Sequence, residues 1–422
     1  MRALDTDPKK IELNFDEYID MKDIRLNLVV SPVPKIQPTV TSHLKTITIV
    51  IKDTLQPNTT YSLNFGRAVT DVNEGNLLKN FTYVFSTGKY IDSISYSGRV
   101  VIANNGKADS TLIVMLHDHL YDSAVAKERP RYIAHLDSSG SFTFNYVKPG
   151  IYTLFALKDE SGTHEYTSKA QYFAFADSPV DLSKPTEPAI LYAYQDTTGF
   201  RTPKKPLLTP VAKKVDKDAP KRLVINGNIA GGLLDLHQKF EFIFPVPIKY
   251  FDSTKILFSQ DSFTTINNYR LLMDSDSKKI TVIYNFTPDT KYHFILAKDF
   301  AEDTLGQKLL KIDTINFSTK KFADYGNLRL RFRNIELDRH PVLIFLQNDK
   351  IIESFTIGRS LRYNNKLFNP GDYDLRILYD KNQNGIWDPG DYYKHLQPEI
   401  VLPLKRRLSV KADWDNEVDI TL

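Results

Sequence analysis

The chain has 422 residues, a length that favours two to four compact domains over one. Lys and Arg total 55 and Asp and Glu total 51, and the resulting formal net charge of +4 is far below the concentrated positive charge of a nucleic-acid-binding protein. Cysteine is absent, which excludes disulfides, thiol nucleophiles and cysteine-bound metals. Hydrophobic residues make up 41% and aromatic residues 12%, so global disorder is excluded as well.

Neither a membrane helix nor a secretory leader is visible in the sequence. The longest apolar runs, 111–116 and 341–346, have the length of strands and fall short of the ~20 residues that a membrane helix needs. Residues 1–15 contain no basic segment followed by an apolar stretch. The protein is therefore either cytoplasmic or lacks its leader in this chain, and the many Asn, Thr, Asp and Tyr residues in its turns favour the second interpretation.

Alternating apolar and polar residues recur along the chain. Successive side chains of a strand point to opposite faces, so a period of two indicates strands with one buried and one wet face. Clusters of Pro, Asn and Gly, which reverse the chain direction, separate these segments, and no long stretch has a convincing helical period. The sequence therefore predicts an all-β fold of tandem β-sandwiches. The clearest strand segments are 10–15, 45–51, 60–65 and 81–87.

The two halves of the chain repeat each other. Pro57 and Tyr61 recur 231 positions later, and the segment 147–161 recurs 221 positions later. Each half is thus predicted to hold two domains, A and B, of about 100 residues each. The predicted order is an A domain at 1–90, a B domain at 91–195, a linker at 196–220, a second A domain at 221–320 and a second B domain at 321–422.

The linker is identified by its composition. The stretch 202–222 contains four prolines and a surplus of Lys and Arg, with few apolar residues. Proline keeps such a segment extended and semi-rigid, which favours a spacer between the two halves. A basic arm for an anionic partner is the alternative.

The A domains share a set of turn and strand motifs. In the first copy these are LQPNTTY at 55–61, VTDVNEGN at 69–76 and YVFST at 83–87. This series resembles the SbsA-type bacterial immunoglobulin-like family, which implies an Ig-like β-sandwich. The second copy keeps the proline, tyrosine, glycine and phenylalanine positions but lacks the Asn that follows Gly75.

The B domains carry a different motif. The segment 137–157, DSSGSFTFNYVKPGIYTLFAL, resembles the transthyretin-like and carboxypeptidase-regulatory-like β-sandwich family, and the second copy retains NPGDYDL at 369–375. Together, the alternating domains resemble the multi-domain Ig-like surface lipoproteins of Bacteroidota. That resemblance implies a protein of the cell envelope, at the outer membrane or cell surface, with a protein partner there and a lipid anchor that is absent from this chain.

No motif for catalysis was found. The pair His117 and His119 lies two residues apart, as metal ligands on a strand can, but no third or fourth ligand is evident nearby. The segment 327–334 places Arg329, Arg331 and Arg333 on one strand face, where they could bind phosphate or carboxylate. A solvated or charge-protected strand is the simpler interpretation of this stripe.

These observations favour a non-enzymatic structural or interaction protein, either a spacer or an accessory subunit of an outer-membrane or surface assembly. The alternative is a carbohydrate-binding surface protein, because aromatic rings stack on sugars. The only two tryptophans, Trp387 and Trp414, lie in the last domain, whereas most Tyr and Phe residues occupy alternating positions typical of a core.

The segment 380–391, DKNQNGIWDPGD, resembles the calcium loops of EF-hands and of bacterial surface adhesins. Gly385 stands at the sixth position, where the sharp turn of such a loop is made. The predicted calcium ligands, with a structural role, are Asp380, Asn382, Asn384, the carbonyl of Ile386, Asp388 and Asp391. The alternative is an Asx-rich hairpin turn held by its own side chains. In the first copy His164 takes the glycine position, so the loop there is expected to bind no calcium.

Overall fold

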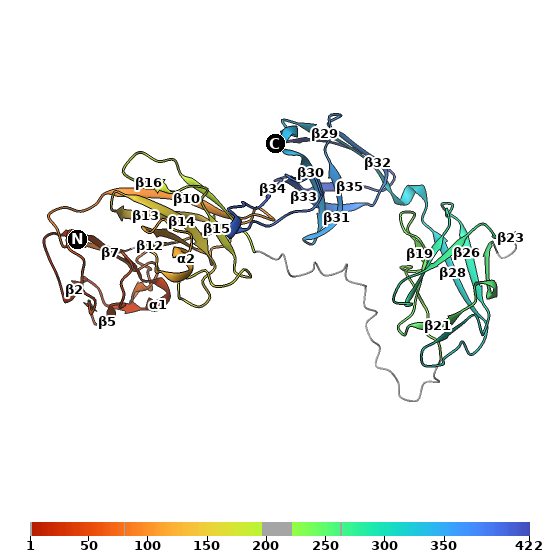
Figure 1. The fold of residues 1–422 in the computed structure, drawn as a ribbon, viewed down its shortest axis with the longest axis horizontal. Helices are drawn as coiled ribbons and strands as arrows, with labels where there is room; N and C mark the ends of the chain where they lie inside the picture. The colour runs from red at the N-terminus through yellow and green to blue at the C-terminus, as the bar shows by residue number, and fades with distance from the viewer. Residues whose placement is uncertain (1, 80, 196–221, 262–263) are drawn as a thin grey trace. The chain divides into compact units, whose positions relative to one another are not determined.

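The computed structural model of the chain describes residues 2–79, 81–195, 222–261 and 264–422 (Figure 1). Within these ranges the α-helices are two single turns, α1 (Ile24–Asn27) and α2 (Ala124–Lys127), and strands make up most of the regular structure. The predicted all-β fold class is therefore confirmed. Among the described residues no helix is long and apolar enough to cross a bilayer. The predicted linker, 196–220, lies outside the described residues.

The first sandwich forms because alternating residues of its strands face one core. Ile47, Phe65 and Phe85 in that core have no exposed surface. The sheets have the orders β1-β9-β7-β4, β2-β6-β5 and β3-β8. The strands are β1 (Arg2–Ala3), β2 (Lys10–Asn14), β3 (Ile19–Met21), β4 (Val29–Ser31), β5 (Thr39–His43), β6 (Thr46–Val50), β7 (Thr60–Asn64), β8 (Val69–Asp71) and β9 (Thr82–Ser86).

The second sandwich pairs the sheet β13-β10-β17 with the sheet β12-β11-β14-β15, and β16 joins β14. All five residues of β11 are buried, so this sheet is covered on its outer face as well as on its core face. A strand buried on both faces carries a continuous apolar run instead of an alternating one. The strands are β10 (Ile94–Ile102), β11 (Ile113–His117), β12 (Tyr132–His135), β13 (Ser141–Val147), β14 (Ile151–Leu157), β15 (Phe173–Phe175), β16 (Val180–Asp181) and β17 (Ala189–Ala193).

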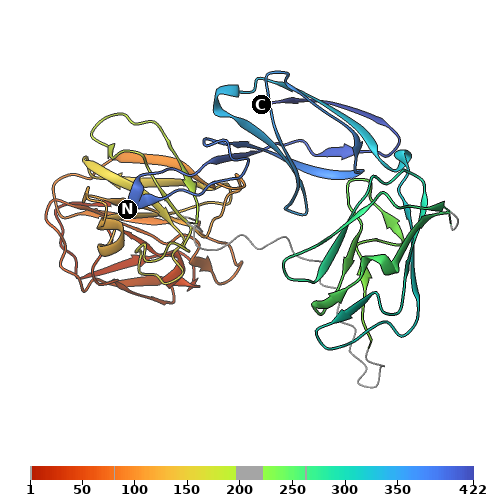
Figure 2. The same cartoon turned by 45° about the vertical axis from the view of Figure 1, so that its right-hand side comes forward.

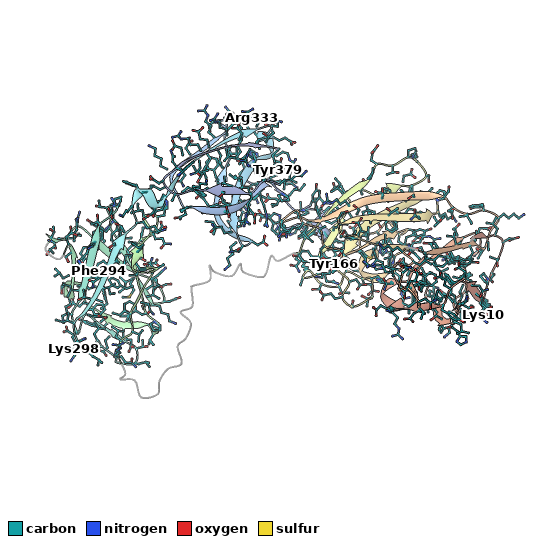
Figure 3. All side chains as sticks on the ribbon, turned by 180° about the vertical axis from the view of Figure 1, so that it is seen from behind. Lys10, Tyr166, Phe294, Lys298, Arg333 and Tyr379 are labelled. Carbon is teal, nitrogen blue, oxygen red and sulfur yellow. The ribbon has the colours of Figure 1, made fainter. Side chains whose placement is uncertain are left out.

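The third sandwich, drawn in green in Figure 2, has an aromatic core. Phe294 lies inside it and Lys298 at its surface (Figure 3). Its sheets are β18-β20-β25-β24, β19-β28-β26-β22-β23 and β21-β27. The strands are β18 (Asn226–Gly227), β19 (Leu233–Leu234), β20 (Glu241–Ile243), β21 (Ile248–Phe251), β22 (Ile256–Gln260), β23 (Thr264–Thr265), β24 (Arg270–Met273), β25 (Lys279–Ile283), β26 (Lys291–Leu296), β27 (Ala301–Asp303) and β28 (Asp313–Thr319).

The last hundred residues form the sheets β32-β29-β36 and β31-β30-β33-β34, and β35 joins β33. The strands are β29 (Gly326–Arg333), β30 (Pro341–Gln347), β31 (Lys350–Thr356), β32 (Arg362–Phe368), β33 (Gly371–Tyr379), β34 (Ile400–Pro403), β35 (Leu408–Val410) and β36 (Asp415–Thr421). Four 3-10 helices complete the described structure: η1 (Ser253–Lys255), η2 (Phe322–Asp324), η3 (Leu337–Arg339) and η4 (Tyr392–Lys394).

The contacts of the chain divide it into two compact units. Of the described residues, the first unit holds those up to 195 together with 336–357 and 374–406. The second holds 222–335, 358–373 and 407–422. Parts of the last B domain therefore pack with the first two sandwiches. The domain boundaries given by the sequence stay predictions.

The internal repeat is visible in matching hydrogen bonds. The Tyr61 hydroxyl accepts from the backbone N–H of Gln56 at 2.8 Å, and 231 positions later Tyr292 accepts from Thr287 at 2.9 Å. The same correspondence holds in the B domains, 221 positions apart. There the hydroxyls of Tyr152 and Tyr373 donate to the carbonyls of Lys148 and Asn369, at 2.9 and 2.8 Å.

Candidate functional site

The segment 380–391 connects β33 to β34 and is a turn held by its own side chains. Asp380 is 2% exposed, and its carboxylate accepts from the backbone N–H groups of Asn384, at 3.2 Å, and Gly385, at 2.6 Å. The Asn382 and Asn384 amides both donate to Asp388 Oδ2, at 2.6 and 2.7 Å. Four of the predicted ligand residues thus come together, in an arrangement typical of an Asx-rich turn.

The two other predicted ligands are placed differently. The side chain of Ile386 is exposed, and its backbone N–H donates to the Asn384 side-chain oxygen at 2.7 Å. The Asp391 carboxylate lies 3.0 Å from Lys394 Nζ, at the start of η4. In the described part of the chain, no group of three or more His, Asp or Glu residues is gathered closely enough to hold a metal.

Glu399 belongs to this loop although sequence reasoning missed it. It is 3% exposed, and its two carboxylate oxygens accept from the backbone N–H groups of Lys381, at 2.7 Å, and Asp388, at 3.1 Å. Burial raises the pKa of Glu399, and the nearby carboxylates of Asp380 and Asp388 raise it further. Glu399 lies outside the twelve-residue pattern, so the pattern did not include it. The available signal was an acidic residue directly before an apolar strand.

The matching loop of the first copy is closed by a histidine. Asp159 Oδ2 accepts from the His164 backbone N–H at 3.0 Å and contacts the same residue's Nδ1 at 2.6 Å. His164 has a left-handed backbone with φ 61°, as Gly385 does with φ 77°. The imidazole therefore occupies the space beside the Asp159 carboxylate. That this loop binds no calcium stays a prediction.

The second copy contains an insertion after its loop. Phe155 pairs with Phe175, whereas Arg376, 221 positions after Phe155, pairs with Pro403, which is 228 positions after Phe175. Seven additional residues therefore lie between the paired strands. We call residues 388–399 the arm.

The arm covers the outer face of the second sandwich. Tyr392 is 5% exposed, and its ring centroid lies 5.1 to 6.4 Å from those of four aromatic residues. Its hydroxyl donates to the Asp122 carbonyl at 2.8 Å. At Gly390 a Cβ atom would lie 2.7 Å from the Tyr194 ring, so this approach requires glycine. We call the four residues, Phe155, Tyr166, Phe173 and Phe175, the aromatic socket.

The two histidines of the sequence motif have different environments. His117 is fully buried, and among the described residues neither of its ring nitrogens has a hydrogen-bond partner. Burial lowers the pKa of His117 to about 4. His119 is exposed and its Nδ1 lies 2.5 Å from Glu128. They do not form a metal site with a third ligand within the ranges the structure describes.

The arginine stripe pairs with acidic residues of the neighbouring strand. β29 and β36 are parallel, and Glu417 receives hydrogen bonds from Arg329, at 2.8 Å, and from Arg331, at 2.7 Å. Asp419 accepts from Arg333 at 2.8 Å. The three arginine side chains remain 44–64% exposed, and Arg333 points outward in Figure 3. This ladder supports the simpler interpretation, a solvated charged strand face.

The tryptophans do not form a common surface. Trp387 is half-buried against the cluster of Val342, Ile344 and Leu346, and its Nε1 donates to the Glu399 carbonyl at 2.7 Å. Trp414 is exposed, with Lys411 Nζ 4.9 Å from its ring centre. Only Trp414 therefore presents an indole face of the kind that stacks on a sugar.

Comparison with solved structures finds similarities at low identity. The major pilin BcpA of Bacillus cereus is 10% identical, with 78% of this chain and 99% of that one covered and a TM-score of 0.17. α2-Macroglobulin from Escherichia coli is 11% identical, with 44% and 72% covered and a TM-score of 0.21. The N-terminal part of the bacterial S-layer protein SbsC is 16% identical, with 46% and 43% covered and a TM-score of 0.17. TM-scores this low do not establish a shared overall architecture.

The comparison with curated proteins found no match. A family model does match the first sandwich, and it is described as a bacterial Ig-like domain. The match covers residues 2–87 and includes the three motifs on which the resemblance of the first A domain rests. Residues 2–87 are thus similar in sequence to bacterial Ig-like domains, as the motifs predict.

Proposed function

We propose that this chain is a non-enzymatic structural or interaction protein of the bacterial cell surface, acting as a spacer or as an accessory subunit of a surface assembly. The main observation in support is that the first, Ig-like sandwich is hydrogen-bonded directly to the second sandwich. Val33 N–H donates to the Arg131 carbonyl at 2.8 Å, and Arg129 donates to the Lys35 carbonyl at 2.8 Å. Sandwiches joined in this way offer reach and large surfaces, although a fold alone does not name a partner.

The finer proposal, supported by the sequence resemblance, is a Bacteroidota outer-membrane lipoprotein whose partner is a protein. Affinity capture from detergent-solubilised envelopes tests it. A single envelope protein retained at stoichiometric yield is the expected result. Binding of the chain to one specific oligosaccharide on a glycan array, without a co-purifying protein, would favour carbohydrate binding instead. Loss of that binding in Trp414→Ala would place the sugar site at Trp414.

We also propose that the 380–391 loop binds calcium in a structural role. Its donors are carboxylate and amide oxygens, which hard cations prefer. The amides of Asn382 and Asn384 now point their nitrogens at Asp388, and a half-turn of each amide would present oxygen instead. Glu399, which is in contact with the loop backbone, is better placed than Asp391 to supply the last carboxylate.

Thermal melts in calcium and in chelator test this proposal. Millimolar calcium should raise the melting temperature of the wild type, and the rise should disappear in Asp380→Asn and in Glu399→Gln. The matched control is Asp159→Asn in the first-copy loop, which should keep the calcium response. Equal melting curves for the wild type in calcium and chelator would contradict calcium binding. If the calcium-induced rise in melting temperature survives in Glu399→Gln but is lost in Asp391→Asn, the result would support the ligand set predicted from the sequence.

A further inference from the structure

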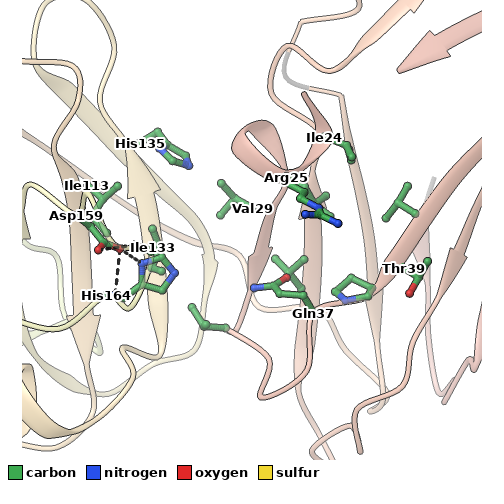
Figure 4. Close-up of a pocket in the computed structure, with 16 residues that line it drawn as sticks. Ile24, Arg25, Val29, Gln37, Thr39, Ile113, Ile133, His135, Asp159 and His164 are labelled. Atoms are coloured by element: carbon green, nitrogen blue, oxygen red, sulfur yellow. Dashed lines mark hydrogen bonds and ion pairs between the residues drawn. The ribbon is translucent and has the colours of Figure 1, made fainter. Parts of the chain in front are cut away.

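A cavity of about 610 Å³ lies between the first and second sandwiches, within the first compact unit (Figure 4). One wall is formed by α1, β4 and β5 of the first sandwich. The other is formed by β11, β12 and the 159–164 loop of the second. This volume is in the range of small-molecule sites, which occur preferentially at domain interfaces.

The cavity has apolar walls on both sides. Leu28, Val29 and Val40 come from the first sandwich, and Ile113 and Ile133 from the second. Apolar walls with a few polar groups are typical of sites that bury most of a small ligand. The cavity therefore suits a ligand with a hydrocarbon body.

A fixed imidazole lies at the wall of the second sandwich. The Asp159 side chain is 3% exposed and accepts from the N–H of Gly162 at 2.9 Å, in addition to its two contacts with His164. A carboxylate only accepts, so His164 Nδ1 carries the proton of that contact. Asp159 is thus already bonded within its own loop, and it holds the His164 ring beside the cavity (Figure 4).

One cation lines the cavity on the side of the first sandwich. Arg25, on α1, is exposed and makes no hydrogen bond or ion pair with any residue that the structure describes. It is the only Lys or Arg among the described residues that line the cavity, and Figure 4 shows it across the space from His164. A guanidinium matches a carboxylate with two parallel hydrogen bonds.

We propose that this cavity binds a small amphiphilic carboxylate, with its single apolar chain against the Ile and Val side chains and its head at Arg25. One guanidinium balances one negative charge, which favours a carboxylate over a doubly charged phosphate. The proposal does not depend on the surface function proposed above.

Isothermal titration calorimetry of the full chain with octanoate, octanol and octylamine tests the proposal, because these ligands share a chain and differ in charge. Octanoate should bind with a Kd on the order of 0.1–1 mM. Octanol should bind about tenfold more weakly, because it lacks the charge-assisted contact, and octylamine more weakly still. Equal affinities for the three would show that no anion is recognised.

Three variants locate the site. Arg25→Gln should weaken octanoate about tenfold and leave octanol unchanged. The matched control is Arg67→Gln, an exposed arginine of the same sandwich outside the cavity, which should bind octanoate like the wild type. Val40→Phe should fill the cavity and weaken both ligands, with a melting temperature near that of the wild type as a check on folding. Undiminished octanoate binding in Arg25→Gln and Val40→Phe would overturn the proposal.

Discussion

His117 is a polar side chain in an apolar layer. Its ring packs edge-on against Phe155, with centroids 5.6 Å apart. The structure keeps it neutral because burial disfavours the charged imidazolium. The sequence placed His117 on a strand, but no local pattern could indicate that this polar residue is buried along with the other four residues of that strand.

The buried His117 makes stability depend on pH. Its pKa is about 4 in the folded state and about 6.5 in the unfolded chain, so the unfolded chain binds more protons between these values. The stability is complete above pH 6.5 and is lost as the pH falls toward 4, by about 2 kcal/mol between pH 7.5 and pH 5. His117→Leu should remove this loss, as measured by urea unfolding at the two pH values.

The control for this prediction is His119→Leu, which changes an exposed histidine two residues away. It should keep the pH dependence of the wild type. An identical pH dependence in His117→Leu and the wild type would show that His117 is not the titrating group.

The ladder between β29 and β36 contributes little stability, because its charges are solvated. Exposed ion pairs are typically worth about 0.2–1 kcal/mol and are screened by salt. The triple variant Arg329→Gln, Arg331→Gln, Arg333→Gln should therefore lower the free energy of unfolding of the second unit by about 1 kcal/mol at low salt, and by less at high salt. The double variant Glu417→Gln, Asp419→Asn should give a similar loss. A much larger loss with unchanged salt dependence would mean that the strand pairing itself needs these charges.

The strands and their repeat were predictable because they depend on local signals. Alternation in 60–65 and the Pro-Asn turn before it predict β7, and alternation after the Pro-Asp turn at 288–289 predicts β26. The apolar run of β11 indicates that both of its faces are buried, but it does not indicate which segment of the chain covers the outer face. That segment was therefore not predictable. The loop at Asp380 was found by its spacing, but Glu399 lies beyond the twelve residues of that pattern, in a connection seven residues longer than that of the first copy.

The arm should contribute strongly to the stability of the first unit. Tyr392 is buried in the aromatic socket, and deletion of a buried aromatic ring costs about 3–5 kcal/mol. Tyr392→Ala should therefore lower the free energy of unfolding of this unit by that amount, as measured by urea unfolding. Tyr393→Ala is the matched control, because Tyr393 is 56% exposed and its loss should cost less than about 0.5 kcal/mol. Equal effects of the two substitutions would contradict burial of Tyr392.

At the scale of the whole molecule, the segments that pack together are not all neighbours in the sequence. The first unit combines the first two sandwiches with two segments from the last hundred residues. Val401 N–H donates to the Ala103 carbonyl at 3.0 Å, and the Lys107 ammonium lies 3.1 Å from Asp349, so both segments are bonded to the second sandwich. We therefore expect the two segments to unfold together with the second sandwich.

Hydrogen exchange of the full chain tests this coupling. In Tyr392→Ala the amides of β11, β15 and β34 should exchange faster together, because removal of the ring uncovers the aromatic socket and releases the strand that follows the arm. The amides of β26 and β28 in the third sandwich should keep their wild-type rates, since they belong to the other unit. Faster exchange confined to residues 388–399 would mean that the arm is only a surface appendage. Faster exchange that extended through β26 would mean that the two units unfold as one.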